Sequence, residues 1–306
     1  MRLGLDGETK SKIVEIMEGA FKVAPNEIKS ISIMKTGMTN QSFLVFCGNK
    51  GYIVRFPGPG ANRMINREEE AAVYQVIGNK GICDNVIYIN PENGCKITEY
   101  IEDVRVCNPY RKEDVEKCIG KLKQIHTMKL QVAHEFDIFK KIDFYESLLR
   151  EYGMTSNYED YEQTKENIFS LKGYMDKHME TKVLAHIDAV PDNFLLVKDG
   201  KGTEQIRLID WEYAGMQDPH VDIAMFGIYS QYNRQQMDWL IREYFQEECP
   251  NYIKTKIYCY IAACGLLWSN WCEYKSSQGE KFGEYALCQY QYAKDYYNVV
   301  KNEVIK

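Results

Sequence analysis

The spacing of hydrophobic and polar positions divides the chain into a first part rich in predicted strands and a longer part rich in predicted helices. From Glu8 to Phe21 the apolar residues recur at helical spacing, which predicts an N-terminal helix. A second helix is predicted over Asn66–Ile77. Around them, runs bounded by turn residues predict five strands, over Ile28–Met34, Ser42–Cys47, Gly51–Phe56, Asn85–Asn90 and Lys96–Tyr100. The first part is therefore expected to be a sheet crossed by one helix.

After Tyr100 the helical period dominates. Helices are predicted over Lys112–Met128, Ile138–Tyr152, Tyr158–His178, Asp222–Ser230, Arg234–Phe245, Tyr252–Tyr274 and Phe282–Ile305. Short strands over Val183–Ala185, Phe194–Val197 and Ile206–Ile209 interrupt them. The pattern predicts an α+β protein with a small N-terminal lobe, residues 1–101, that carries an antiparallel sheet. Residues 102–306 are expected to form a larger, mainly helical C-terminal lobe.

Composition and charge narrow the class of protein. The 306 residues are 45% hydrophobic and 27% charged, as in ordinary soluble globular proteins. A net charge of -6 argues against a broad nucleic-acid or anionic-membrane surface. The N-terminus lacks the apolar core of a signal peptide, and the longest apolar stretch, Ile261–Trp268, is too short for a membrane span. A cytoplasmic protein that binds no nucleic acid is expected.

The cysteines and histidines show no metal-binding pattern. No two of the ten cysteines are spaced as Cys-x-x-Cys, and the five histidines lack the spacing of zinc ligands. In a reducing compartment such cysteines are expected to be free thiols. No transition-metal site is predicted.

The stretch from His186 to Asn193 gives the clearest indication of a catalytic site. It has the form His-x-Asp-x-x-x-x-Asn and is followed by an apolar strand that ends at Asp210. Phosphoryl transfer from a nucleotide needs one carboxylate to accept the proton of the attacking hydroxyl, and an amide oxygen and a second carboxylate to hold magnesium. Asp188, Asn193 and Asp210 offer this set, although Asp and Asn are also common in ordinary loops. The flanking buried strands favour the catalytic interpretation.

A nucleotide also needs donors for its phosphates. The segment from Thr36 to Ser42 lies between the first two strands, where a phosphate-covering loop belongs, and it includes Thr39 and Asn40. It has one glycine rather than the Gly-x-Gly-x-x-Gly of protein kinases, and an ordinary hairpin turn would use the same residues.

Arg55 is the cation expected on the phosphates, because it stands amid apolar residues of the third strand. A solvent-facing arginine on an edge strand is the alternative. Glu68, Glu69 and Glu70 begin the next helix, and acids at a helix N-terminus are also favourable simply because they stabilise the helix dipole. Glu70 is chosen as the partner of Arg55, since it shares a helical face with Val73 and Ile77.

Trp268 and Trp271 are spaced i,i+3 and share one helix face, with Phe282 and Tyr285 farther on. Aromatic faces stabilise quaternary ammonium groups. Such a pair alone is more typical of a packed core, and only the phosphoryl-transfer motif favours a binding site.

Together these motifs resemble the choline/ethanolamine kinase family, within the wider aminoglycoside-phosphotransferase-like group, from about Ile31 to Tyr292. The resemblance rests on Gly37–Asn40, Ile53–Gly58, Asn66–Glu70, His186–Asn193 and Ile209–Gly215. It implies a two-lobed protein-kinase-like fold and an ATP- and Mg²⁺-dependent kinase that phosphorylates the hydroxyl of choline. Asp188 would be the catalytic base, and Asn193 and Asp210 would carry Mg²⁺.

The resemblance also implies contacts with both substrates. The hinge Thr98–Ile101, with Glu99 and Ile101, would hold adenine by backbone groups. Trp268 and Trp271 match the paired tryptophans of the choline cage. Tyr229 or Tyr232, and Phe282 or Tyr285, are candidates for its other walls, and Glu212 for a negative charge near the cationic head.

Two alternatives stay open. One is a kinase for ethanolamine, another amino alcohol or an aminoglycoside. The other is a catalytically inactive kinase fold that binds a choline-like ligand or a protein.

Overall fold

A computed structural model describes residues 5–21, 24–34, 39–198, 202–246 and 248–304. By their contacts these residues form two compact units. The first comprises Met1–Val106 and Phe194–Tyr213, and the second comprises Cys107–Asn193 and Ala214–Lys306. The sequence predicts a single boundary, after residue 101. The contacts instead group Phe194–Tyr213, which comes after that boundary, with the first unit.

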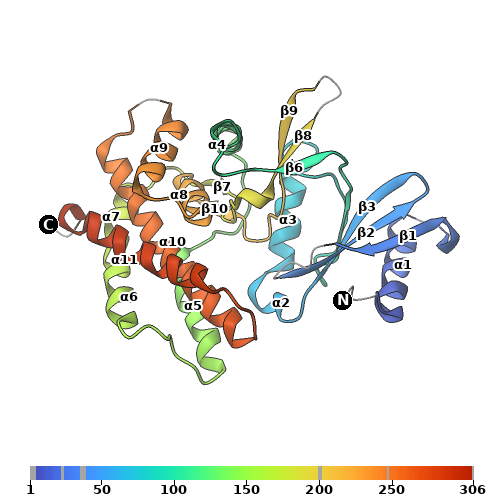
Figure 1. The fold of residues 1–306 in the computed structure, drawn as a ribbon, viewed down its shortest axis with the longest axis horizontal. Helices are drawn as coiled ribbons and strands as arrows, with labels where there is room; N and C mark the ends of the chain where they lie inside the picture. The colour runs from blue at the N-terminus through green and yellow to red at the C-terminus, as the bar shows by residue number, and fades with distance from the viewer. Residues whose placement is uncertain (1–4, 22–23, 35–38, 199–201, 247, 305–306) are drawn as a thin grey trace. The chain divides into compact units, whose positions relative to one another are not determined.

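The first unit is built on a five-stranded antiparallel sheet with the order β1-β2-β3-β5-β4 (Figure 1). Its strands are β1 (Ile28–Ile33), β2 (Asn40–Cys47), β3 (Lys50–Pro57), β4 (Val86–Ile89) and β5 (Lys96–Glu99). Its helices are α1 (Gly7–Phe21), α2 (Ala61–Met64) and α3 (Arg67–Ile77), with a 3-10 turn at Pro25–Glu27. The predicted succession along the chain of a helix, three strands, a helix and two strands is confirmed, whereas the strand order within the sheet and α2 were not predicted.

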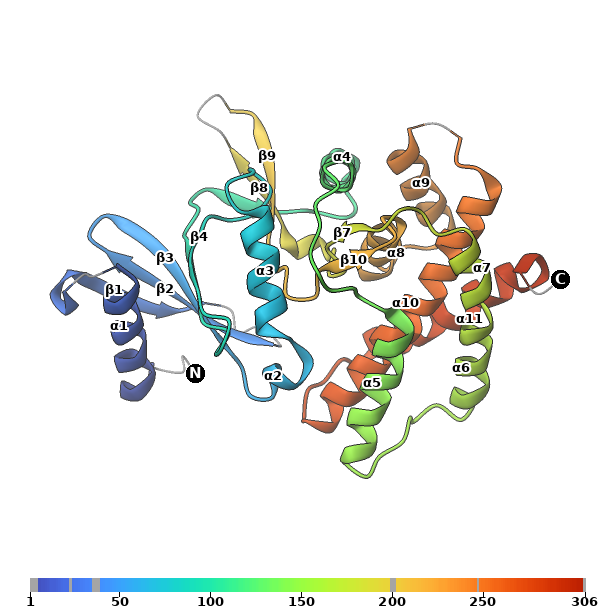
Figure 2. The same ribbon diagram turned by 180° about the vertical axis from the view of Figure 1, so that it is seen from behind.

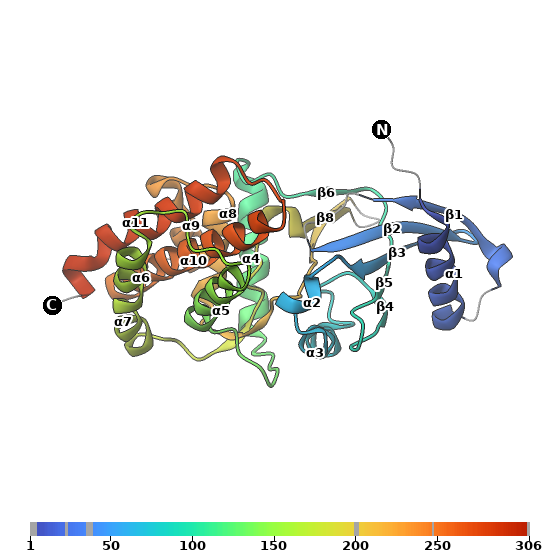
Figure 3. The same ribbon diagram turned by 90° about the horizontal axis from the view of Figure 1, so that it is seen from below.

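One face of this sheet carries the apolar core of the unit. Val54 and Phe56 of β3 pack with Ile13 and Met17 of α1, which lies against the sheet (Figure 3). The cluster as a whole is Ile13, Met17, Phe43, Val45, Tyr52, Val54, Phe56, Cys95 and Ile97. Side chains alternate along a strand, so the residues between these positions point to the other face.

A second sheet explains why a later segment belongs to this unit. β8 (Phe194–Lys198) pairs on one side with β6 (Val104–Val106) and on the other with β9 (Glu204–Leu208). The strand β6 is not predicted from the sequence, because three residues are too few to show a period of two.

The second unit is mainly helical (Figure 2). Its helices are α4 (Lys112–Thr127), α5 (Ile138–Glu151), α6 (Tyr161–Ser170), α7 (Lys172–Lys177), α8 (His220–Tyr229), α9 (Arg234–Phe245), α10 (Asn251–Ser277) and α11 (Glu284–Val304). The strand β7 (Val183–Ala185) pairs with β10 (Gly215–Gln217), and a 3-10 turn spans Pro191–Asn193. The expected α+β class is thereby confirmed.

One helix differs from prediction, and one contact between helices depends on a glycine. The single helix expected over Tyr158–His178 is two helices, because the chain tightens where Leu171 N donates to Ile168 O, at 3.1 Å. The buried helix α10 comes so close to α11 that a Cβ on Gly265 would lie 2.7 Å from Gln289 O. Glycine at this position therefore permits the contact between the two helices.

Two features bear on the class of protein. All ten cysteines are free thiols in the described structure, and most are buried. Among the residues described, no helix combines the length and the apolar character needed to cross a bilayer.

Candidate active site

In the first unit, β3 and β5 carry two buried cations on one face of the sheet. Arg55 lies between Val54 and Phe56, which belong to the apolar core, so its side chain points away from that core. Lys96 is the register partner of Arg55 on β5 and shares its face. Arg55 is 6% exposed and Lys96 is 5% exposed, so both charges need partners within the protein.

Helix α3 supplies those partners. Asn66 caps it by accepting hydrogen bonds from Glu68 N and Glu69 N, and this start turns Arg67 and Glu70 inward. Glu70 pairs with Arg55, with Arg67 Nη1 at 2.7 Å and with Lys96 Nζ at 3.6 Å. Burial alone would raise the pKa of Glu70, but the cations outweigh it and lower that pKa to about 2.

Asp210 follows β9 with its backbone in the left-handed region, at φ 64°. Trp211 anchors the turn, since its Nε1 donates to Leu208 O at 2.7 Å. Arg55 Nη1 lies 2.8 Å from Asp210 Oδ1. The Asp210 side chain is 34% exposed, whereas those of Glu70 and Glu212 are 0% and 3% exposed. Of these three carboxylates, Asp210 is the one that solvent reaches.

Glu212 joins three parts of the first unit. Its Oε2 accepts hydrogen bonds from Asn40 Nδ2 at 2.8 Å and from Arg67 Nη1 at 3.1 Å. Arg55 Nη1 lies 3.6 Å away. Burial, together with the charge of Asp210, raises the pKa of Glu212 to about 7. The residue thus ties the start of β2 to α3 and to the segment after β9.

These six side chains, Arg55, Arg67, Glu70, Lys96, Asp210 and Glu212, are called the charged cluster below. Carboxylate oxygens of Glu70, Asp210 and Glu212 lie within 4.8 Å of one another. Oxygen donors of this kind are those that a hard divalent cation such as Mg²⁺ prefers. Because Glu70 and Glu212 are buried against Arg55 and Arg67, the partly exposed carboxylate of Asp210 is the one of the three that fits magnesium.

The other nucleotide candidates make backbone contacts. Thr39 O accepts a hydrogen bond from Gly58 N at 2.8 Å, which fixes the end of the loop before β2. Thr36, Gly37 and Met38 lie outside the described residues. In the expected hinge, Glu99 N donates to Asn85 O at 2.9 Å and Tyr100 N donates to Gly51 O at 3.0 Å. Ile101 follows them and is half-buried.

In the second unit, Asp222 of α8 shapes the loop that carries Asp188. Asp222 Oδ2 accepts from His186 N at 2.9 Å, and its Oδ1 accepts from Ile187 N at 2.7 Å. These bonds hold Ile187 at φ 68°, a conformation that a β-branched residue rarely adopts. His126 Nε2 lies 2.9 Å from Asp222 Oδ2. Burial would raise the pKa of Asp222, but bonds from His126 and the His186 backbone outweigh it and lower that pKa.

The carboxylate of Asp188 is engaged on both oxygens. Asn193 Nδ2 donates to Asp188 Oδ2 at 3.1 Å and to Asp188 O at 2.9 Å. Tyr229 Oη donates to Asp188 Oδ1 at 2.7 Å. The structure therefore brings together Asp188 and Asn193 of one loop with Tyr229 at the end of α8.

Tyr229 is also the first ring of an aromatic series. Its centroid lies 5.6 Å from that of Trp268, which lies 5.7 Å from that of Trp271. Trp271 in turn lies 5.3 Å from Phe282. Both indoles are buried, at 3% and 6% exposed. These rings, Tyr229, Trp268, Trp271 and Phe282, are called the aromatic series below.

Two further tyrosines were candidates. Burial first, and then the charges of Cys272 and Asp188, raises the pKa of Tyr285 well above its usual value. Tyr232 instead donates its hydroxyl to Pro109 O, and its own carbonyl accepts from Tyr292 Oη at 2.7 Å. Its hydroxyl is thus committed to the chain segment before α4.

Sequence reasoning missed three residues of these arrangements. Arg67 and Lys96 belong to the charged cluster, and Asp222 holds the loop of Asp188. A signal was available for Asp222, because it is an acid within an otherwise almost wholly apolar helix.

Comparison with known proteins gives the family and the fold of the chain. The family model described as choline/ethanolamine kinase matches residues 31–264. Protein LicA of Haemophilus influenzae is 25% identical over 263 residues, which cover 82% of this chain and 75% of that protein. The crystal structure of choline kinase LicA from Streptococcus pneumoniae superposes with a TM-score of 0.81 and 30% identity, covering 96% of this chain and 100% of that one.

A crystal structure of LicA in complex with AMP has a TM-score of 0.77 and 29% identity, covering 95% of this chain and 98% of that one. The family match spans more than half of the sequence and agrees with the solved structures in fold. The chain therefore belongs to the choline/ethanolamine kinase family.

Proposed function

We propose that this kinase transfers the γ-phosphate of ATP to the hydroxyl of choline, with Mg²⁺, and releases phosphocholine. The observation that carries the proposal is the hydrogen bond from Tyr229 to Asp188, because it joins the candidate base to an aromatic series. Aromatic faces attract a trimethylammonium group, which has no N–H to donate in a hydrogen bond. A base beside them suits an acceptor that has a cationic head and a hydroxyl a few bonds away.

In the proposed reaction Asp188 accepts the proton of the choline hydroxyl while the hydroxyl oxygen attacks the γ-phosphorus of ATP, and the bond from that phosphorus to the leaving group, ADP, breaks. Asn193, whose amide bonds the second carboxylate oxygen, fixes the direction in which the base points. The choline hydroxyl donates to Oδ1 alongside the Tyr229 hydroxyl, which keeps its hydrogen bond to that oxygen. Trp268, Trp271, Tyr229 and Tyr285 hold the cationic head.

The nucleotide is assigned to residues of the first unit. Arg55 neutralises charge on the phosphates, with Glu70 holding its guanidinium, and Thr39 and Asn40 contribute at the start of β2. The backbone at Glu99 and Ile101 receives adenine. The AMP complex of LicA supports a nucleotide site in this family.

Asn193 and Asp210 would hold the magnesium ion, and the partly exposed carboxylate of Asp210 supports this assignment. When bound, the ion neutralises negative charge that develops on the phosphates. Glu212 would place a negative charge near the cationic head of the acceptor. Its Oε2 accepts hydrogen bonds from Asn40 and Arg67.

The test is a nucleotide-turnover assay with choline, ethanolamine and kanamycin as acceptors. We expect choline to give the highest kcat/KM, and we expect chelation of Mg²⁺ to remove turnover. A preference for ethanolamine would contradict the assignment of the aromatic series to the acceptor site. Absence of transfer to all three acceptors, with Mg²⁺ present, would favour a binding module over an enzyme.

A further inference from the structure

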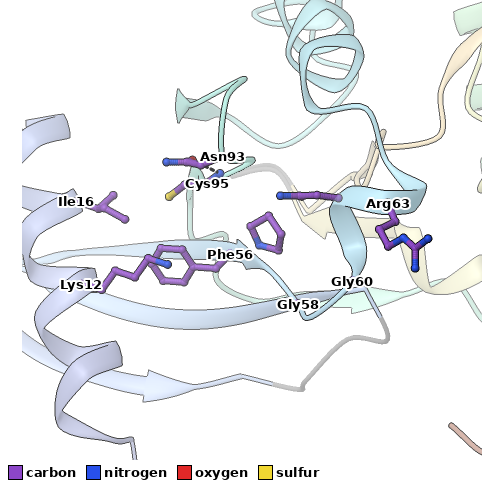
Figure 4. A pocket seen from close by; sticks show the side chains of 10 residues that line it. Lys12, Ile16, Phe56, Gly58, Gly60, Arg63, Asn93 and Cys95 are labelled. Atoms are coloured by element: carbon purple, nitrogen blue, oxygen red, sulfur yellow. Dashed lines mark hydrogen bonds between the residues drawn. The ribbon is translucent and has the colours of Figure 1, made fainter. Parts of the chain in front are cut away.

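Lys96 is a buried lysine of β5 that has no part in the reaction as described so far. It lies between Cys95 and Ile97, which belong to the apolar core, so its side chain points to the opposite face of the sheet. Cys95 lines a hollow on the core face together with Phe56, the neighbour of Arg55 (Figure 4). Lys96 and Arg55, which are register partners, therefore lie side by side on the face away from this hollow.

The ammonium group of Lys96 contacts two successive turns of α3. Its Nζ lies 3.6 Å from Glu70 Oε1 and donates to Tyr74 Oη at 2.6 Å. The same Nζ lies 4.2 Å from the centroid of the Tyr74 ring, within the range of a cation–π contact. Tyr74 follows Glu70 by four residues, so the two side chains share one face of the helix. Lys96 thus holds this face of α3 against β5.

The Oε1 atom of Glu70 is shared between two cations. Arg55 Nη2 pairs with this oxygen and Lys96 approaches it from the neighbouring strand, whereas Arg67 Nη1 takes Oε2. Burial would raise the pKa of Glu70, and the charge of Lys96 comes second to that of Arg55 among those that lower it. Arg55 Nη1 also lies 2.8 Å from Asp210 Oδ1. Two carboxylates therefore hold the guanidinium that a phosphate would need.

We infer that Lys96 is a positioning residue for the phosphates of ATP, which neutralises Glu70 and so leaves the Arg55 guanidinium available to them. The inference rests on the proposed kinase function and adds a residue to it. A carboxylate that keeps a second cation holds the first less strongly, because part of its charge is already compensated. Lys96 is only 5% exposed and acts from behind Glu70, not on the phosphates themselves.

The test compares a non-hydrolysable ATP analogue with adenosine, each titrated calorimetrically into the full chain with Mg²⁺ and without an acceptor. Lys96→Met preserves most of the side-chain length and removes the charge. We expect it to weaken binding of the analogue about tenfold and to change adenosine binding by less than about twofold. Adenosine has no phosphate, so a general loosening of the unit would instead weaken the binding of both ligands.

A double-mutant cycle tests whether Lys96 acts through Glu70. In the Glu70→Gln background the carboxylate charge is absent, so Lys96→Met is expected to change the affinity for the analogue by less than about twofold. Lys96→Gln keeps a donor toward Tyr74 and is the second variant, with an expected loss of about threefold or more. Lys50→Met, at an exposed lysine of β3, is the matched control and is expected to bind both ligands as the unaltered chain does.

Three results would overturn the inference and leave the proposed function standing. They are an unchanged affinity of Lys96→Met and Lys96→Gln for the analogue, equal losses for the analogue and adenosine, and a full further loss in the Glu70→Gln background. Equal losses would assign Lys96 to the packing of α3 alone. Absence of analogue binding by the unaltered chain would instead contradict the proposed function, and this inference with it.

Discussion

Tyr229 donates its hydroxyl hydrogen to Oδ1 of Asp188 across 2.7 Å, so the ring that begins the aromatic series also touches the candidate base. In the proposed reaction, selection of the acceptor and activation of its hydroxyl would therefore involve the same carboxylate. A donor at this oxygen stabilises the ionised form of Asp188.

Removing that donor tests the relationship. Tyr229→Phe keeps the ring and is expected to lower kcat about tenfold and to move the acidic limb of the pH–kcat profile to higher pH, because the base loses one hydrogen bond. Tyr232→Phe is the control, since its hydroxyl bonds Pro109 O instead. An unchanged acidic limb in Tyr229→Phe would show that the hydrogen bond does not tune the base.

The aromatic series is expected to select the trimethylammonium head. Trp271→Leu removes one ring face, worth about 1–2 kcal/mol, and is expected to raise the KM for choline about tenfold. The KM for ethanolamine should rise less, because a primary ammonium keeps hydrogen bonds that do not need the ring. Trp239→Leu, a half-buried tryptophan of α9, is the matched control. Equal losses for both acceptors would assign Trp271 to core packing alone.

Glu212 makes stability depend on pH. Its folded-state pKa of about 7 lies above its ordinary value of 4.5, so between these pH values the folded chain holds a proton that the unfolded chain has released. Relative to Glu212→Gln, the unaltered chain is therefore expected to lose unfolding free energy as pH rises from 5 to 8, by as much as about 3 kcal/mol.

The measurement is denaturant unfolding of both proteins at pH 5 and at pH 8, without Mg²⁺. Glu70 contributes the opposite slope, but only below pH 4.5, because its pKa is lowered to about 2. A stability difference that stays constant between pH 5 and pH 8 would show that Glu212 is ionised throughout.

Asp222 is expected to position the base without touching substrate. Asp222→Asn weakens the bonds to His186 N and Ile187 N and is expected to cost about 2–4 kcal/mol of unfolding free energy, because buried charged hydrogen bonds are lost. The kcat should fall while the KM for ATP changes little. Asp295→Asn, an exposed acid of α11, provides the control. Full activity in Asp222→Asn would mean that the loop holds its shape unaided.

Particular elements show what the sequence could and could not reveal. Arg234–Phe245 was predicted at its observed bounds, because its hydrophobic spacing is regular and Asn233 caps it. Glu70 was predicted to pair with Arg55 because it lies on the same helical face as the apolar Val73 and Ile77. The structure contains this ion pair. Arg67 was missed, because only the entry angle set by the Asn66 cap turns it inward.

Lys96 was missed for another reason. Its place opposite Arg55 depends on the register between β3 and β5, which lie far apart in the sequence. The strands β6 and β10 have three residues each, too few for a periodic signal, and neither is a continuous apolar run like the equally short β7. Tertiary pairing, rather than local pattern, decides these parts of the fold.

The most direct measurement is steady-state turnover of Asp188→Asn with choline and ATP, together with its nucleotide affinity and melting temperature. Asparagine preserves the size of the side chain but cannot accept the proton of the hydroxyl. We expect turnover to be abolished, while the melting temperature and the binding of an ATP analogue stay close to those of the unaltered protein. Near-normal turnover in this variant would contradict the assignment of Asp188 as the base.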